Sequence, residues 1–136
     1  MKDFVKNNTA GIGLLILLSI TLILHLLILA GIIPYNIFWG GQMENEAVNI
    51  VLMELFAVVV LLIFMGITIL KAYYPSKYPL LAKAGMWIVF AYLLLNTAGN
   101  LSSEQIIEKA VLTPTTFLMS LLALRLAISQ KSIRKP

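Results

Sequence analysis

The sequence predicts an all-α fold: a polytopic membrane protein whose four transmembrane helices form an antiparallel bundle. Three observations predict it: an apolar composition, four apolar windows of membrane-spanning length, and positive charges concentrated in alternate connections and at the termini. Hydrophobic residues make up 60% of the 136 residues, charged residues make up 12%, and the mean hydropathy is +0.95. Water-soluble domains carry about twice that share of charge, so we expect the chain to lie in a lipid bilayer.

Each predicted helix is a run of mostly apolar residues, close to the roughly 20 that cross a bilayer. The four windows are residues 11–33, 47–70, 80–98 and 110–128. The connections contain turn-forming prolines and glycines, so consecutive helices run antiparallel and residues 1–136 form a single membrane domain. Lys83 and Arg125 fall inside the last two windows, near the same predicted interface, where a long side chain reaches the headgroups.

The start of the fourth helix has two interpretations. Residues 102–105 (SSEQ) have the pattern of a capping box. Thr113-Pro114 also suits a helix start, because the missing N–H of a proline costs nothing in the first turn. Residues 103–112 therefore form either a separate interfacial helix or the beginning of one continuous helix that is kinked at Pro114.

Nine of the ten lysine and arginine residues fall on one side of the predicted bundle. They occupy the N-terminal tail, the connection between the second and third helices, and the C-terminal end, whereas the other two connections contribute only Lys109. Cytoplasmic connections carry such an excess of positive charge, so we expect both termini in the cytoplasm. Aromatic residues flank both interfaces, as in the belts of membrane proteins: Tyr73, Tyr74 and Tyr78 inside, and Tyr35, Phe38 and Trp39 outside.

Two ionisable residues lie well inside the predicted helices, His25 and Glu54. An ionisable group within a span is costly, so it needs either a partner or a function. From the helix rise, His25 lies about 12 Å from the outer end of the first window, and Glu54 about 10 Å from that of the second. The matching depth predicts a direct His25–Glu54 hydrogen bond or ion pair. Such a pair either belongs to a functional site or only fixes helix packing.

The other polar residues also fall in the predicted outer half. Asn96 and Asn100 are four residues apart and share one face of the third helix, and Thr116 belongs to a Thr/Ser stripe on the fourth. Each has a simpler interpretation, because Asn often ends a helix, Thr and Ser often pack helices together, and Trp39 suits an interfacial anchor. The candidate ligand-binding residues are His25, Glu54, Asn96, Asn100, Trp39, Gln42 and Thr116.

The composition excludes several kinds of chemistry. The chain has no cysteine, which excludes disulfides, thiolate metal sites and the thiol chemistry of four-helix enzymes that couple disulfide formation to quinones. The positive charges lie between apolar runs, so a nucleic-acid partner is not implied. With a single histidine and no hydrolase, Walker or Rossmann motif, we predict no catalytic residue, no metal and no cofactor.

The segment from His25 to Gln42 (HLLILAGIIPYNIFWGGQ), followed by a helix bearing Glu54, resembles the start of small, functionally uncharacterised four-helix membrane proteins of bacteria. The resemblance covers most of the chain and implies the fold without an activity. In architecture the chain also resembles the DoxX-like and the sterol-isomerase-like (EXPERA) families, the second of which gathers His, acidic and Asn side chains inside its bundle. No diagnostic motif of either family is present, so no catalytic role follows.

Three functions fit these observations. The first is the binding or transport of a small amphiphile or solute through a polar pocket in the outer half of the bundle. The second is an accessory subunit, in which polar residues serve packing against a membrane-complex partner or a second copy of the chain. The third is an enzyme that acts on a lipidic substrate with a His–Glu pair. The richness in Ile, Leu, Lys and Asn favours a bacterial inner membrane.

Overall fold

A computed structural model describes residues 7–38 and 47–129 of the chain, and within them the fold is all-α. Its main elements are α1 (Asn7–Leu29), α2 (Ala47–Tyr73), α3 (Pro79–Ser102) and α4 (Thr113–Ile128). A 3₁₀ turn, η1 (Tyr35–Ile37), follows α1, and a π-helical turn, η3 (Glu108–Leu112), leads into α4.

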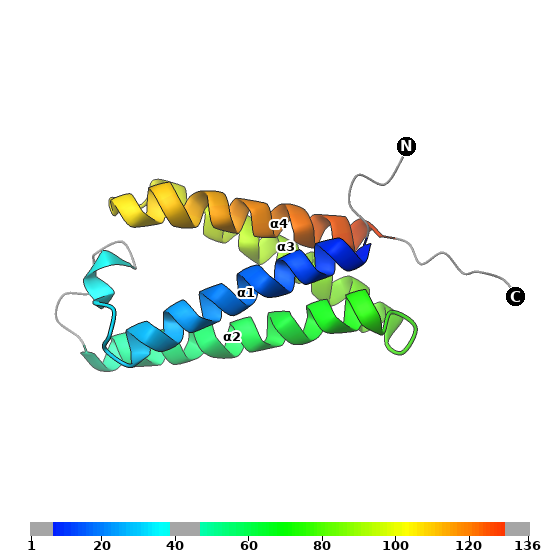
Figure 1. Cartoon of the computed structure of the whole chain (residues 1–136), viewed down its shortest axis with the longest axis horizontal. Helices are drawn as coiled ribbons and strands as arrows, with labels where there is room; N and C mark the ends of the chain where they lie inside the picture. The colour runs from blue at the N-terminus through cyan, green and yellow to red at the C-terminus, as the bar shows by residue number, and fades with distance from the viewer. Residues whose placement is uncertain (1–6, 39–46, 130–136) are drawn as a thin grey trace, which may run out of the picture.

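The four helices form an elongated antiparallel bundle (Figure 1). α1 pairs with α2 and α3 pairs with α4, and the two hairpins pack together through α1 with α4 and α2 with α3. One end of the bundle carries the turn at residues 74–78, and we call it the turn end. The opposite end carries η1 and the connection from α3 to η3, and we call it the η1 end.

Each crossing is long and apolar enough to span a bilayer. Among the described residues the spans are Asn7–Leu29, Asn49–Tyr73, Pro79–Ser102 and Glu108–Ile128. Large apolar side chains such as Ile16, Phe56 and Leu95 cover the outside of the bundle and are more than half exposed. Because such a surface is unstable in water but stable against lipid tails, the chain is a four-span membrane protein.

The core is an apolar column to which all four helices contribute. Its buried residues include Leu14, Leu18, Leu61, Phe64, Met86, Val89, Leu93, Met119, Ala123 and Leu126. Towards the turn end the helices approach closely, because a Cβ added at Gly11 of α1 would lie only 2.7 Å from the Cβ of Ala72 in α2. A Cβ added at Gly85 would likewise lie 3.0 Å from Ile67. The turn end is therefore the tightly packed part of the bundle.

The first helix ends four residues earlier than predicted, at Leu29 rather than at residue 33. Gly31 has a φ of 73°, its N–H bonds to the carbonyl of Ile28, and the N–H of Ile32 bonds to that of Leu27. These bonds form a Schellman motif, which favours glycine because its left-handed backbone strains other residues. The apolar run continues past this glycine, so hydropathy alone placed the helix end too late.

The third helix extends beyond its predicted end, to Ser102 instead of residue 98. Asn96 and Asn100 therefore lie within the helix, and neither ends it. The expected capping box is not formed, because the Ser102 hydroxyl donates to the carbonyl of Ala98 in its own helix. The Ser103 hydroxyl accepts a bond from the N–H of Gln105 instead, which closes the turn after α3.

Helical residues run without a break from residue 106 to residue 128, so the segment before Pro114 is no separate interfacial helix. The N–H of Thr113 bonds to the carbonyl of Glu108, five residues earlier, which is the π-helical spacing. In a regular α-helix the ring of Pro114 would clash with the carbonyl of Ala110, four residues before it. The wider π turn accommodates the proline and makes η3 continuous with α4.

Candidate functional site

His25 of α1 and Glu54 of α2 are in direct contact, as their matching depth predicted. The Nδ1 atom of His25 lies 2.6 Å from Oε2 of Glu54. The Glu54 side chain is fully buried, whereas that of His25 is 20% exposed. This contact holds the imidazole in one orientation.

The pair lies nearer the end of α1 than the sequence indicated. Because α1 ends at Leu29, His25 is about 6 Å from the helix end rather than about 12 Å. The predicted depth of Glu54 is unchanged, since α2 begins at Ala47 as expected. The two residues still meet, although Glu54 lies further from the start of its helix than His25 lies from the end of its own.

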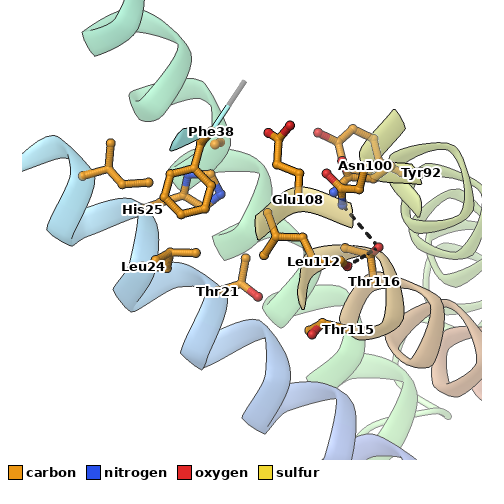
Figure 2. Close-up of a pocket in the computed structure, with 13 residues that line it drawn as sticks. Thr21, Leu24, His25, Phe38, Tyr92, Asn100, Glu108, Leu112, Thr115 and Thr116 are labelled. Atoms are coloured by element: carbon orange, nitrogen blue, oxygen red, sulfur yellow. Dashed lines mark hydrogen bonds between the residues drawn. The ribbon is translucent and has the colours of Figure 1, made fainter. Parts of the chain in front are cut away.

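A second polar contact joins α3 to α4. The hydroxyl of Thr97 lies 3.0 Å from Oγ1 of Thr116. Nδ2 of Asn100 lies 3.4 Å from the same oxygen (Figure 2). All three side chains are buried. Thr116 therefore links the two helices, which fits the packing interpretation of the Thr/Ser stripe. Ser120, the next residue of that stripe, bonds only within α4, to the carbonyl of Phe117.

Glu108 is a buried carboxylate that is not among the residues predicted from the sequence. It lies in η3, only 6% exposed, and its Oε2 accepts a hydrogen bond from the Ser103 hydroxyl. The predicted fourth window began at residue 110, so Glu108 lay outside every predicted span. One feature of the sequence could have predicted its burial: Glu108 lies only two residues before the fourth apolar window, and the helix begins before that window.

These groups surround one cavity near the η1 end, with a volume of about 140 Å³. Its lining residues come from all four helices and from the η1 and η3 segments: Thr21, Leu24, His25, Ile28, Phe38, Ala57, Tyr92, Asn96, Asn100, Glu108, Leu112, Thr115 and Thr116. In Figure 2, α1 supplies one side with Thr21 and His25, while Asn100, Glu108 and Thr116 lie across from it.

The candidate residues from the sequence divide into three groups. His25, Asn96, Asn100 and Thr116 line the cavity. Glu54 is absent from the lining and contacts the cavity only through His25. Trp39 and Gln42 lie outside the described residues.

Phe38 was predicted to belong to an outer aromatic belt, and this prediction was wrong. Its side chain is only 7% exposed and lines the cavity. The 3₁₀ turn η1 and the extended backbone at Phe38 direct the chain back over the bundle, so the ring covers this end of the cavity. Tyr35, three residues earlier, is exposed as an interfacial residue would be.

The cavity reaches the surface of the bundle beside α3. Tyr92 and Asn96 line it and are exposed. The Tyr92 ring packs edge-on against Phe64 of α2, with centroids 5.1 Å apart. The two hairpins separate towards the η1 end (Figure 1), so the cavity lies in the more loosely packed half of the molecule.

The ionisable groups at the cavity are mainly acidic. His25 and Glu108 line it, Glu54 is bonded to His25, and no lysine or arginine is among its described lining residues. Within residues 7–38 and 47–129, no group of three or more His, Cys, Asp or Glu side chains could hold a metal ion. The described lining therefore contains one carboxylate, one imidazole, hydroxyls and amides.

Comparison with models of known protein families, with curated proteins and with solved structures finds no match to this chain. The four-helix architecture therefore stands on the chain's own helices, and no family is identified for it. The resemblances noted from the sequence bring no activity to the site.

Proposed function

We propose that this four-span membrane protein binds, and moves or presents, the polar part of a small amphiphile or solute in the cavity near its η1 end. The observation that supports this most directly is the cavity lining, in which polar groups from three helices and η3 converge inside a lipid-facing bundle. Ionisable and amide groups within a span are rare and costly, and they commonly mark a substrate pathway. A chain that needed only packing would gain little from surrounding a cavity with them.

The proposed orientation places the cavity in the outer leaflet. The lysines and arginines at the turn end and at the termini put that end in the cytoplasm by the positive-inside rule. The η1 end then faces outwards, and a ligand reaches the cavity from the outer leaflet beside Tyr92 and Asn96. A bacterial inner membrane remains the proposed location, with both termini cytoplasmic.

The size of the cavity limits what it holds. A volume of about 140 Å³ is close to that of cavities that admit one benzene-sized molecule, ~150 Å³. Pockets for larger ligands are about 300–1,000 Å³. The cavity thus suits a headgroup or a small solute, with any longer apolar tail lying in the surrounding lipid.

The alternative is an accessory subunit whose polar residues only join its helices. The Thr97–Thr116 contact and the His25–Glu54 contact favour it, because both bridge neighbouring helices. The two functions differ in their need for the cavity. A binding protein requires its volume, whereas an accessory subunit can contact its partner without it.

Small molecules that copurify with the protein test the proposal. The protein is isolated in mild detergent and analysed by native mass spectrometry, as wild type and as Ala57→Leu, which places a larger side chain in the cavity. The matched control is Ala91→Leu on the exposed face of α3. We expect a bound small molecule in the wild type and the control, reduced at least fivefold in Ala57→Leu. Equal profiles in all three proteins would favour the accessory subunit.

A further inference from the structure

We propose that the turn end of the bundle binds the phosphate of an anionic phospholipid between Lys71 of α2 and Lys83 of α3. This inference goes beyond the proposed function, because the two lysines lie at the end opposite the cavity and are not among its described lining residues. Three observations support it: the proximity of the two ammonium groups, the distribution of the acidic residues, and the position of both lysines inside membrane-spanning segments.

Lys71 is held in place between α2 and α4. Its Nζ atom donates to the backbone carbonyl of Ser129, the residue that follows α4, at 3.2 Å. The bond can form because α2 and α4 both end at the turn end of the bundle (Figure 1). An ammonium group has three N–H donors. The bond to Ser129 therefore fixes the half-buried lysine and leaves it donors for a further acceptor.

Lys83 adds a second positive charge beside Lys71. It is exposed near the start of α3, and the two ammonium groups are close enough to repel each other. Like charges at a few ångströms destabilise one another, most of all where water is partly excluded. A phosphate between them removes this repulsion, because its negative charge attracts both ammonium groups and its oxygens accept their hydrogen bonds.

The helices around this lysine pair supply no carboxylate. The sequence has no Asp or Glu from residue 55 to residue 103, and none after residue 108. Glu54 lies about 26 Å from Lys71 along α2, at the rise of an α-helix. On the predicted side of the lysine pair, the sequence has nine basic residues and a single acidic one, Asp3. The complementary partner is therefore an anion from outside the chain.

The position of the lysine pair favours a lipid over a soluble anion. Lys71 lies in the span Asn49–Tyr73 and Lys83 in the span Pro79–Ser102, each within about one helical turn of the end of its span. Lysines at this depth extend to the lipid headgroups, and basic groups there attract anionic lipids. Exposed tyrosines, which favour the same level of the bilayer, flank the turn: Tyr73, Tyr74 and Tyr78.

Trp87 is a natural reporter of the lipid beside the lysine pair. It is exposed on α3, four residues after Lys83 and on the same face of the helix. Its ring packs edge-on against Phe90, with centroids 5.8 Å apart. The chain has two tryptophans, so Trp39→Phe leaves Trp87 as the only one. Its fluorescence then reports on neighbouring lipids whose acyl chains carry bromine, because bromine quenches tryptophan on contact.

Quenching of Trp87 tests the inference in the full chain carrying Trp39→Phe. The protein is reconstituted in phosphatidylcholine vesicles that contain increasing shares of either brominated phosphatidylglycerol or brominated phosphatidylcholine. The dependence of quenching on lipid share gives the relative affinity of the two lipids for the site. We expect a preference of about tenfold for phosphatidylglycerol, since each basic residue near the surface contributes to the attraction. Equal quenching by the two lipids would overturn the inference.

Variants then locate the headgroup. Lys83→Gln removes one charge from an exposed side chain and should lower the preference about fivefold. Lys83→Arg keeps the charge and should keep the preference. Lys71→Gln retains a side chain that can donate to Ser129, and it should act like Lys83→Gln. Lys109→Gln is the matched control, because it removes an exposed lysine from the η1 end and should change nothing.

A second comparison distinguishes a defined site from diffuse attraction. Lys77 is exposed in the turn, with its ammonium group 5.8 Å from the centre of the Tyr78 ring. Solvent and salt screen such a charge, so Lys77→Gln should lower the preference by less than about twofold. Equal losses in Lys77→Gln and Lys83→Gln would overturn a site at the lysine pair. Displacement of the lipid by inorganic phosphate at constant ionic strength would overturn a lipid ligand.

Discussion

A carboxylate inside a membrane-spanning helix is stable only when the groups around it replace water. Glu54 meets this requirement through His25 on the neighbouring helix, and Glu108 accepts a bond from the nearby hydroxyl of Ser103. The two carboxylates also differ in their relation to the cavity, because Glu108 lines it and Glu54 lies behind the imidazole. At the residue scale, Glu54 therefore contacts and orients the imidazole, whereas Glu108 forms part of the cavity wall.

The His25–Glu54 contact should be measurable as a coupling free energy. Interhelical hydrogen bonds in membranes average about 0.6 kcal/mol and reach about 1.7 kcal/mol. Since Glu54 is fully buried and the contact is 2.6 Å, we expect a coupling of about 1–2 kcal/mol. The measurement is a double-mutant cycle with His25→Gln and Glu54→Gln, from unfolding free energies in mixed micelles. Ser102→Ala, which removes an exposed hydroxyl, should change stability by less than about 0.5 kcal/mol. A coupling near zero would contradict a stabilising pair.

At the scale of elements, the π turn η3 determines where Glu108 points. A π turn adds one residue to a helical turn, so it rotates the residues before it by about 100° relative to a regular α-helix. Pro114 sustains this turn by excluding the α-helical arrangement around the carbonyl of Ala110. The proline thus positions a carboxylate six residues before it without contacting any ligand.

Pro114→Ala should therefore weaken binding without unfolding the bundle. The new N–H allows a regular α-helix through residues 108–114, which rotates Glu108 away from the cavity. We expect the amount of copurified small molecule to fall about fivefold, while the unfolding free energy stays equal or rises by up to about 1 kcal/mol. Native mass spectrometry and unfolding of the same samples provide the two readouts. Pro79→Ala at the first turn of α3 is the matched control and should leave binding unchanged.

At the scale of the whole molecule, packing is uneven along the bundle axis. The turn end is closed by small residues, with Gly11 against Ala72 and Gly85 against Ile67. The η1 end holds the cavity and the polar contacts. A bundle that is tight at one end and hollow at the other suits a ligand that enters from one leaflet only.

The proposed orientation of the bundle rests on the distribution of its lysines and arginines, and it is testable because the chain has no cysteine. Ser76→Cys places a thiol in the turn between α2 and α3, and Ser102→Cys places one at the η1 end, both at exposed serines. A membrane-impermeant maleimide added to intact cells should label Ser102→Cys at least tenfold more than Ser76→Cys. After permeabilisation the two should label equally. The reverse pattern would place the η1 end in the cytoplasm and overturn the outer-leaflet site.

Much of the architecture was predictable because membrane insertion depends on local properties of the sequence. Windows of about 20 apolar residues predicted four helices in nearly correct positions, since only a helix satisfies its backbone in lipid. The helix ends were less accurate, because they depend on single residues such as Gly31 and Pro114 rather than on average hydropathy. The His25–Glu54 contact was predicted from depths of about 12 Å and 10 Å, and it is formed although His25 lies only about 6 Å from its helix end.

The sequence by itself determined the number of crossings, their apolar lipid-facing surface and the charge asymmetry between the two ends. Only the tertiary structure decided that Phe38 folds over the cavity, that Glu108 enters it and that Glu54 lies behind His25. The physical reason is that the hydropathy and charge of each segment decide whether that segment lies in lipid or in water. A cavity, by contrast, is formed between segments that are far apart in the chain. Glu108 and His25 line the same cavity because the π turn η3 and the packing of the α3–α4 hairpin against α1 bring them there. No local pattern in the sequence predicts this arrangement.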